Sequence, residues 1–217
     1  MNLITEIPSH SCDGLSLTSI PEGLSAIREP DCSAMIWQRS PLASFQSWID
    51  ELAPEQLPKA RTIVSPEKMR EAVMHVCDIC ETPAGPERDM LIDDVAALAN
   101  IFAELMQAPY LLLRLDVISS NACRKFHTDT VTARLICTYR GTGTQYGIAG
   151  DGAEPERVFT APTAAPIVLR GKNWPTIPQT GFVHRSPPIE GTGETRLVLV
   201  LDPVLDLEDA SDGHFVH

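Results

Sequence analysis

The chain has 217 residues, of which 43% are hydrophobic, and its formal net charge is −12. This length suits one domain with a sizeable core, and no apolar run approaches the roughly 20 residues that a membrane-spanning helix needs. The acidic balance argues against a nucleic-acid partner, because proteins bind phosphate backbones through clustered lysine and arginine.

Residues 1–60 start with MNLITEIPSH, which lacks the basic and apolar regions of a secretory signal. We therefore expect a soluble cytoplasmic protein with reduced cysteines and no membrane partner. The stretch is interrupted by six prolines, Pro8, Pro21, Pro30, Pro41, Pro54 and Pro58. Proline removes a backbone donor, so we expect an irregular N-terminal arm with short helical turns. Within it, the spacing of apolar residues predicts one helical piece from Leu42 to Leu52.

Residues 61–108 are predicted to form a helical support that packs on the outside of the main core. Ser65 and Pro66 have the types favoured at the N-cap and first position of a helix, which should end near Cys80. A second helix is predicted over 86–107 from its sustained period near 3.6. We expect its buried face to hold Met90, Leu91, Val95, Leu98 and Phe102, and its wet face to hold Asp93, Asp94 and Glu104.

Residues 109–203 have the sequence pattern of a β-rich domain. Seven short apolar runs are separated by Gly, Pro and Asn clusters, at 111–118, 131–139, 145–148, 157–160, 167–170, 181–185 and 196–202. Such spacing indicates an antiparallel jelly roll or barrel, so the fold class is mainly β with flanking N-terminal helices. Residues 204–217 form an acidic tail with few core residues, which we expect to fray.

A candidate metal site begins with His127 and Asp129, two positions apart at the entry to a predicted strand. Residues i and i+2 of a strand project to the same face, so both side chains can reach one ion. His184 is the remaining candidate for a third ligand, because the other histidines lie in the arm, on a helix or in the tail. Two imidazoles and one carboxylate leave coordination positions open, as in non-haem Fe(II) oxygenases.

At this point the sequence resembles the Fe(II)/2-oxoglutarate dioxygenases of the prolyl-hydroxylase type. The resemblance lies in His127-Thr-Asp129, Arg134, Thr138-Tyr139 and the Gly141-Thr-Gly-Thr144 turn, and further on in Pro166-Ile-Val-Leu and in HRSPP with Gly193 and Arg196. It covers residues 109–202 and implies a double-stranded β-helix core with an HxD…H triad. The sequence pattern FHTD…HRSPPIEGTGETRLVLVLD also resembles a bacterial family of uncharacterised proteins. No reaction is established for that family.

The resemblance implies that Arg196 holds the distal carboxylate of 2-oxoglutarate, with Tyr139, or Thr138 by strand parity, adding a hydroxyl. Arg196 lies 12 positions after His184, where the family usually has about 10, so Arg185 and Arg134 stay open as alternative carboxylate partners. If the strand of 195–202 lies beside the strand of His184, alternation puts Arg196 on one face with Val198 and Val200.

Two functions of different classes follow from these residues. The first is an Fe(II)- and 2-oxoglutarate-dependent oxygenase that hydroxylates a C–H bond of an unknown substrate. The second is a non-catalytic zinc-handling protein that uses the same His127, Asp129 and His184, with Cys123 closing a tetrahedral site. Each motif also has a plainer interpretation: a surface His-Asp hydrogen bond, an arginine at a sheet edge, and core thiols for Cys77-x-x-Cys80.

Overall fold

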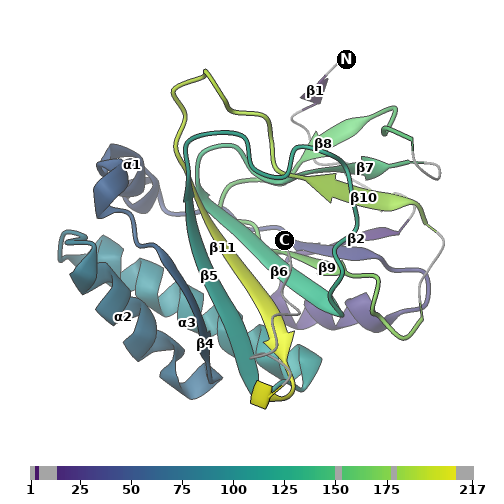
Figure 1. The fold of residues 1–217 in the computed structure, drawn as a ribbon, viewed down its shortest axis with the longest axis horizontal. Coiled ribbons are helices and arrows are strands. Elements are labelled where there is room, and N and C mark those ends of the chain that lie inside the picture. The colour runs from purple at the N-terminus through teal and green to yellow at the C-terminus, as the bar shows by residue number, and fades with distance from the viewer. Residues whose placement is uncertain (1–2, 5–13, 150–152, 177–179, 209–217) are drawn as a thin grey trace.

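Two facing β-sheets and a layer of helices make up the protein, in a computed structural model that describes residues 3–4, 14–149, 153–176 and 180–208 (Figure 1). The larger sheet has the strand order β2-β3-β9-β6-β11-β5-β4. Its strands are β2 (Leu15–Thr18), β3 (Ala34–Trp37), β4 (Ala60–Val64), β5 (Tyr110–Ile118), β6 (Ala133–Arg140), β9 (Ile167–Arg170) and β11 (Arg196–Val204). All of its neighbouring strands are antiparallel except β2 and β3.

The smaller sheet has the order β1-β8-β7-β10 and lies at the upper right of Figure 1, at the opposite end of the molecule from α2. Its strands are β1 (Leu3–Ile4), β7 (Gln145–Ile148), β8 (Val158–Thr160) and β10 (Phe182–Arg185). Side chains of both sheets meet in an interior core that includes Ile136, Tyr146, Phe182 and Val200. This arrangement is the double-stranded β-helix that the sequence predicts.

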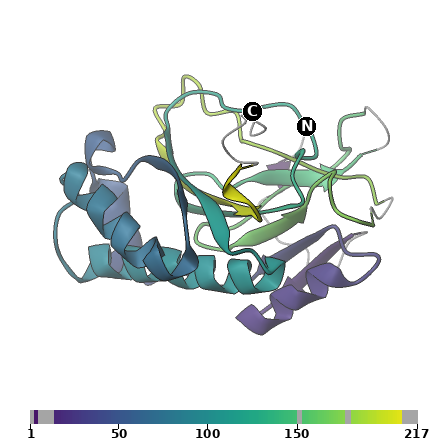
Figure 2. The same ribbon diagram turned by 60° about the horizontal axis from the view of Figure 1, so that its bottom comes forward.

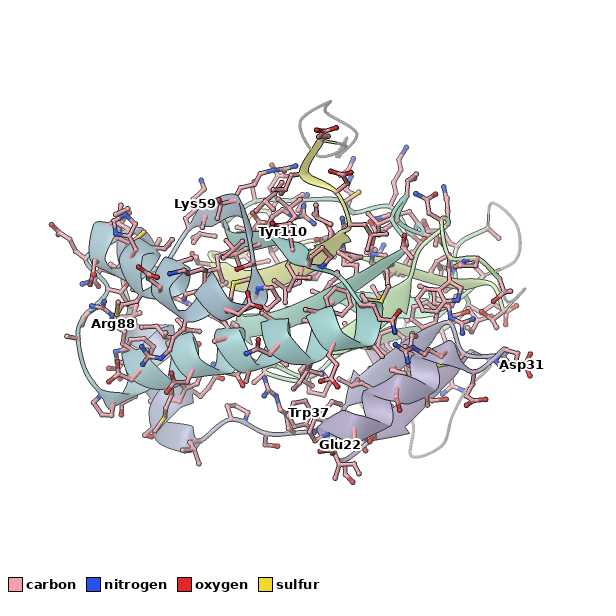
Figure 3. The ribbon with its side chains drawn as sticks, turned by 90° about the horizontal axis from the view of Figure 1, so that it is seen from below. Glu22, Asp31, Trp37, Lys59, Arg88 and Tyr110 are labelled. Carbon is pink, nitrogen blue, oxygen red and sulfur yellow. The ribbon has the colours of Figure 1, made fainter. Side chains whose placement is uncertain are left out.

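The helices cover the other face of the larger sheet. They are α1 (Ala43–Glu51), α2 (Met69–Ile79) and α3 (Pro86–Met106), joined by 3₁₀ turns at Pro21–Arg28, Pro54–Gln56 and Pro66–Lys68. Figure 2 shows α3 running beneath the sheet, and Figure 3 shows it from below, from Arg88 in its first turn to the 3₁₀ helix that carries Glu22. Among the described residues, no helix is long and apolar enough to cross a membrane.

Strand β11 joins the two cores because its side chains alternate strictly. Val198 and Val200 belong to the interior core between the sheets, whereas Leu197, Leu199 and Leu201 belong to the core beneath the helices. Arg196 is also on the interior side, where it lines a cavity with Val198. The expected parity therefore holds, although β11 pairs with β5 and β6 and not with β10, which lies in the other sheet.

Four expectations from the sequence need correction. The start of the expected helical support, Ala60–Val64, is strand β4 of the larger sheet. Residues 15–18 and 34–37 of the expected irregular arm are strands of the larger sheet, because the short run at Ala34–Trp37 is apolar enough to be buried despite the surrounding prolines. Met90 is 39% exposed and not buried. Asp94 is half-buried because Arg39 binds it through two hydrogen bonds of 2.6 Å. The expected fraying of the tail falls largely on residues 209–217, outside the described residues.

Candidate metal centre

His127 and His184 face each other across the mouth of the interior. His184 belongs to β10, whereas His127 lies in the loop between β5 and β6. The two residues form an isolated antiparallel bridge, in which each backbone N–H donates to the carbonyl of the other at 3.0 Å. Their rings lie 4.6 Å apart between centroids. The backbone pairing therefore brings together two side chains that are 57 positions apart in the sequence.

Asp129 completes the group, as its position two residues after His127 predicts. Its Oδ1 lies 3.5 Å from Nε2 of His127, and its Oδ2 lies 3.1 Å from Nε2 of His184. One ligand atom from each of the three residues lies within 4.8 Å of the others, a spacing that could hold a metal ion. Asp129 Oδ2 is buried and has no hydrogen-bond partner, so the short distance to His184 is not a satisfied hydrogen bond.

Mutual contacts set the protonation of the three side chains, and the carboxylate of Asp129 raises the pKa of His127. Nδ1 of His127 lies 2.8 Å from the carbonyl oxygen of Lys125, so it must be the protonated donor, and Nε2 faces Asp129. Burial lowers the pKa of His184, which favours the neutral ring. Burial alone would raise the pKa of Asp129, but His127, His184 and Arg134 together hold it well below its usual range. A neutral imidazole and an ionised carboxylate are the forms that bind metals.

Arg134 fixes the Asp129 carboxylate from behind. Its guanidinium donates to Asp129 Oδ1 at 2.5 Å and, through two further hydrogen bonds of 2.6 and 2.8 Å, to Asp202. Asp202 is 1% exposed and had no distinguishing motif in the sequence, because its role depends on β11 lying beside β6. Arg134 is therefore engaged by two carboxylates and is not the free carboxylate partner that the sequence left open.

The backbone of the Asp129 loop is held by the segment after β9. Lys172 N–H donates to the carbonyl of Asp129 at 2.8 Å, and Asn173 N–H donates to the carbonyl of Val131 at 3.1 Å. Gly171 makes this approach possible: a Cβ at that position would lie 1.9 Å from the Val131 carbonyl oxygen. The position of Asp129 thus depends on contacts between two loops, beyond the strand periodicity that suggested it.

Arg196 lies deep in the interior, in a cavity of about 150 Å³ that His127 and His184 also line. The residue is 1% exposed. Its Nε donates to the Thr142 carbonyl at 2.6 Å, and one terminal nitrogen lies 3.5 Å from Thr138 Oγ1. No carboxylate of the described residues comes within 4.0 Å of the guanidinium. Burial lowers the pKa of Arg196 to about 10, so it stays charged at neutral pH.

Tyr139 does not belong to this cavity, which corrects one of the two expected hydroxyl donors. β6 carries an irregularity opposite Leu197 and Val198, and Tyr139 is the extra residue between Arg140 and Thr138. Its hydroxyl donates to Asp94 Oδ2 at 2.6 Å on the helix side of the sheet. Thr138 faces the interior instead, as strand parity indicated.

Arg185, another arginine that the sequence left open as a carboxylate partner, lines the same cavity as Arg196 but is engaged by other side chains. Its Nε donates to Gln145 Oε1 at 2.8 Å, and its guanidinium stacks over the ring of Phe126, 4.3 Å from the centroid. These contacts hold the side chain against β7 and the Phe126 loop.

Cys123 does not close the site. Its sulfur lies 3.9 Å from Nδ1 of His127, on the far side of the ring from the nitrogen that faces Asp129. Within the described part of the chain, the group of potential ligands comprises His127, Asp129 and His184 alone. Cys77 is fully buried in the core beneath the helices, which agrees with the interpretation of a core thiol.

Comparisons with known proteins place the fold and the family. Comparison with curated proteins finds no match to this sequence. The structure is similar to dioxygenase for auxin oxidation 1 from Arabidopsis thaliana, solved with 2-oxoglutarate, with a TM-score of 0.54 and 9% identity over 91% of this chain and 94% of that one. The rice dioxygenase for auxin oxidation gives 0.49 and 10% over 85% and 78%. An oxidoreductase of the 2OG-Fe(II) oxygenase family from Burkholderia pseudomallei gives 0.42 and 10% over 88% and 95%.

At 9% identity, the likeness to the Arabidopsis dioxygenase shows a shared fold, the double-stranded β-helix, and nothing beyond the fold. The family is shown by the sequence itself. One family model matches residues 18–202, which includes the triad, Thr138 and Arg196. The chain therefore belongs to the family described as Protein of unknown function (DUF1826).

Proposed function

We propose that this protein is an Fe(II)- and 2-oxoglutarate-dependent oxygenase, with His127, Asp129 and His184 as the metal ligands. The observation that carries the proposal is the pairing of two features in one interior: an open triad of ligands and, deeper in, a buried arginine without a carboxylate partner among the described residues. Two imidazoles and a carboxylate suit iron and leave positions for other ligands.

The triad fits a metal ion because it leaves an unsatisfied anionic atom. A buried carboxylate oxygen without a hydrogen bond costs free energy, and Asp129 Oδ2 is such an atom. A cation between Oδ2 and the two Nε2 atoms would satisfy it. Arg134, with its hydrogen bond to Asp129 Oδ1, and Lys125, with its carbonyl on Nδ1 of His127, would then orient the ligands.

The interior cavity fits a dicarboxylate for a similar reason. The charge of Glu194 acts on Arg196, but no salt bridge within 4.0 Å joins them among the described residues. A buried guanidinium without a direct ion pair is destabilising, so Arg196 favours an anion. An arginine fork pairs bidentately with a carboxylate, and Thr138 Oγ1 is near enough to add a hydroxyl. Arg196 and Thr138 would then hold one carboxylate of 2-oxoglutarate, in the cavity that His127 and His184 also line.

Bound iron would supply the activation of O₂ that no side chain can perform, with 2-oxoglutarate as the source of two electrons. The chain's own residues bind and orient the partners. The backbone bridge between His127 and His184 keeps two ligands in register, and Arg134 keeps Asp129 ionised and fixed. Val198, Val200 and Ile136 line the cavity and exclude water from the region between the metal ligands and Arg196.

The zinc-handling function keeps the same three ligands but loses its fourth. A closed structural zinc site needs four ligands in a tetrahedron. Cys123 lies on the Nδ1 side of His127, and the potential ligand group of the described residues stops at three. The geometry therefore favours a site with open positions, which suits catalysis.

The experiment that tests the proposal is anaerobic reconstitution of the full chain, purified without chelators. We expect one equivalent of Fe(II) per chain, and a visible absorption change on addition of 2-oxoglutarate that the Fe(II) protein shows and the metal-free protein lacks. Binding of zinc with no response of any metal form to 2-oxoglutarate would overturn the oxygenase in favour of the zinc-handling function.

A further inference from the structure

A second cavity, of about 440 Å³, lies beside the triad and shares Arg114, Cys123, His127 and Arg134 with the smaller cavity that Arg196 lines. His127 and Asp129 line it, so a molecule bound there would contact the metal ligands directly. Cavities of roughly 300–1,000 Å³ are typical of small-molecule sites. Its walls come from β4, β5, the loop that carries the triad and the segment after β9.

The charge of this cavity is opposite to that of the chain. Five basic side chains line it, Arg61, Arg114, Lys125, Arg134 and Lys172, against two acidic ones, Asp129 and Asp202. Both carboxylates are hydrogen-bonded to Arg134. The lining thus carries more basic than acidic side chains, in a protein whose net charge is −12.

Arg61 and Arg114 are the core of this field because they lie directly opposite each other across β4 and β5. Like charges in such a cross-strand pair are destabilising. Arg114 also has a buried Nε without a hydrogen-bond partner, and Asp202 is 3.7 Å from its nearest terminal nitrogen. Burial chiefly, together with Arg134 and Arg61, lowers the pKa of Arg114, against the opposite effect of Asp202 and Asp116.

We propose that this cavity binds the primary substrate of the oxygenase through an oxyanion, a carboxylate or a phosphate, held by Arg61 and Arg114. That the bound anion belongs to the substrate rests on the proposed function, whereas the anion site itself rests on the geometry of the cavity. An oxyanion between the two guanidinium groups would relieve their repulsion and satisfy Arg114 Nε. Lys125 and Lys172 lie on the exposed rim, where they would attract an anion from solution.

The substrate class follows from the same lining. Leu112, Phe126 and Val131 give the cavity an apolar wall beside the basic residues. A small organic acid or phosphate ester, with an apolar carbon skeleton, matches both parts. Its anion would anchor at Arg114, and the carbon that reacts would lie next to His127 and Asp129.

The test is an NMR titration of the ¹⁵N-labelled full chain, free of metal, with acetate, inorganic phosphate and the neutral analogue acetamide. We expect acetate or phosphate to shift the amides of Arg61, Arg114 and Lys172, and acetamide to leave them unchanged. The better of the two anions identifies the anionic group. Arg61→Gln and Arg114→Gln should each weaken the affinity about tenfold or more, because a charge-assisted hydrogen bond is lost.

Two matched variants separate this site from the rest of the chain. Arg70→Gln removes one positive charge on α2, where Arg70 pairs with Asp93, and should leave anion affinity at the cavity unchanged. Lys68→Gln removes another surface charge, where Lys68 pairs with Glu71, and should also leave the shifts at Arg61 and Arg114 intact. Arg61 is exposed on the edge strand β4, so its variant tests the proposal even if Arg114→Gln does not fold.

Equal affinity in Arg61→Gln and the unaltered chain, or equal shifts with acetamide, would overturn the anion site. The result is independent of iron. A protein that binds Fe(II) and 2-oxoglutarate but no anion at Arg61 would refute this inference alone. A protein that binds the anion but not Fe(II) would keep the anion site and refute the oxygenase.

Discussion

The backbones of His127 and His184 hydrogen-bond to each other in both directions, with both N–H to carbonyl distances at 3.0 Å. The bridge joins the loop after β5 to β10, and Asp129 follows two residues later. The placement of the two histidines is thus set by main-chain pairing, which persists when a side chain is changed.

His127→Ala, Asp129→Ala and His184→Ala should each abolish stoichiometric metal binding and leave the fold largely intact, because the main-chain bridge and both cores remain. Metal content after anaerobic equilibration with Fe(II) is the measurement, with circular dichroism as the check on folding. His75→Ala, on the exposed face of α2, is the matched control and should bind metal normally. A variant that keeps full occupancy is not a ligand.

Thr138 and Tyr139 are adjacent but face opposite sides of the sheet, so their variants should differ. Thr138→Val removes the hydroxyl near Arg196 and should weaken 2-oxoglutarate binding about fivefold, on the order of 1 kcal/mol. Tyr139→Phe should leave that affinity unchanged but lower the free energy of unfolding by roughly 1–2 kcal/mol, because Asp94 loses a buried donor. The reverse pattern would place Tyr139 in the cosubstrate site. Calorimetry and urea denaturation measure the two effects.

Thr138 and Tyr139 show the limit of what strand patterns in the sequence can predict. The strands at 145–148 and 167–170 match the structure, because clear turn residues bound short apolar runs. Simple alternation fails at Tyr139 because β6 is irregular opposite Leu197 and Val198, and a bulge leaves no distinct pattern in one sequence.

The triad was predictable because His127 and Asp129 are close in sequence and few histidines compete for the third place. The partners of the triad were not. Asp202 reaches Arg134 only when β11 lies beside β6, and Arg61 meets Arg114 only in the register of β4 on β5. Strands β2 and β3 were missed because the prolines around them outweighed a four-residue apolar run. Strand β4 was missed because it is short and mostly exposed, and so has no clear apolar alternation.

Gly171→Ala should disturb the site without touching a ligand. The new Cβ would lie 1.9 Å from the Val131 carbonyl oxygen and 3.0 Å from that of Asp129, so the two loops must separate. We expect Fe(II) affinity to fall about tenfold or more and stability to fall by roughly 1–3 kcal/mol, as for other overpacked sites. Both are read by anaerobic metal titration and urea denaturation.

Gly85→Ala is the control for Gly171. Its Cβ would meet only Glu87 Oε2, at 3.8 Å, and its backbone is extended, so neither metal affinity nor folding should change much. Equal metal affinity in Gly171→Ala and the unaltered chain would mean that the contact between the loops does not position Asp129.

The space between the two sheets is proposed to hold a metal and a dicarboxylate together, and Arg196→Gln tests this most directly. The measurement is anaerobic calorimetric titration of 2-oxoglutarate into the Fe(II)-loaded chain and into this variant. We expect equimolar binding that requires Fe(II), and a loss of about 2 kcal/mol or more in the variant at unchanged metal content, because a charge-assisted bidentate contact is gone. Affinity that is the same with and without Arg196, or with and without Fe(II), would contradict the account.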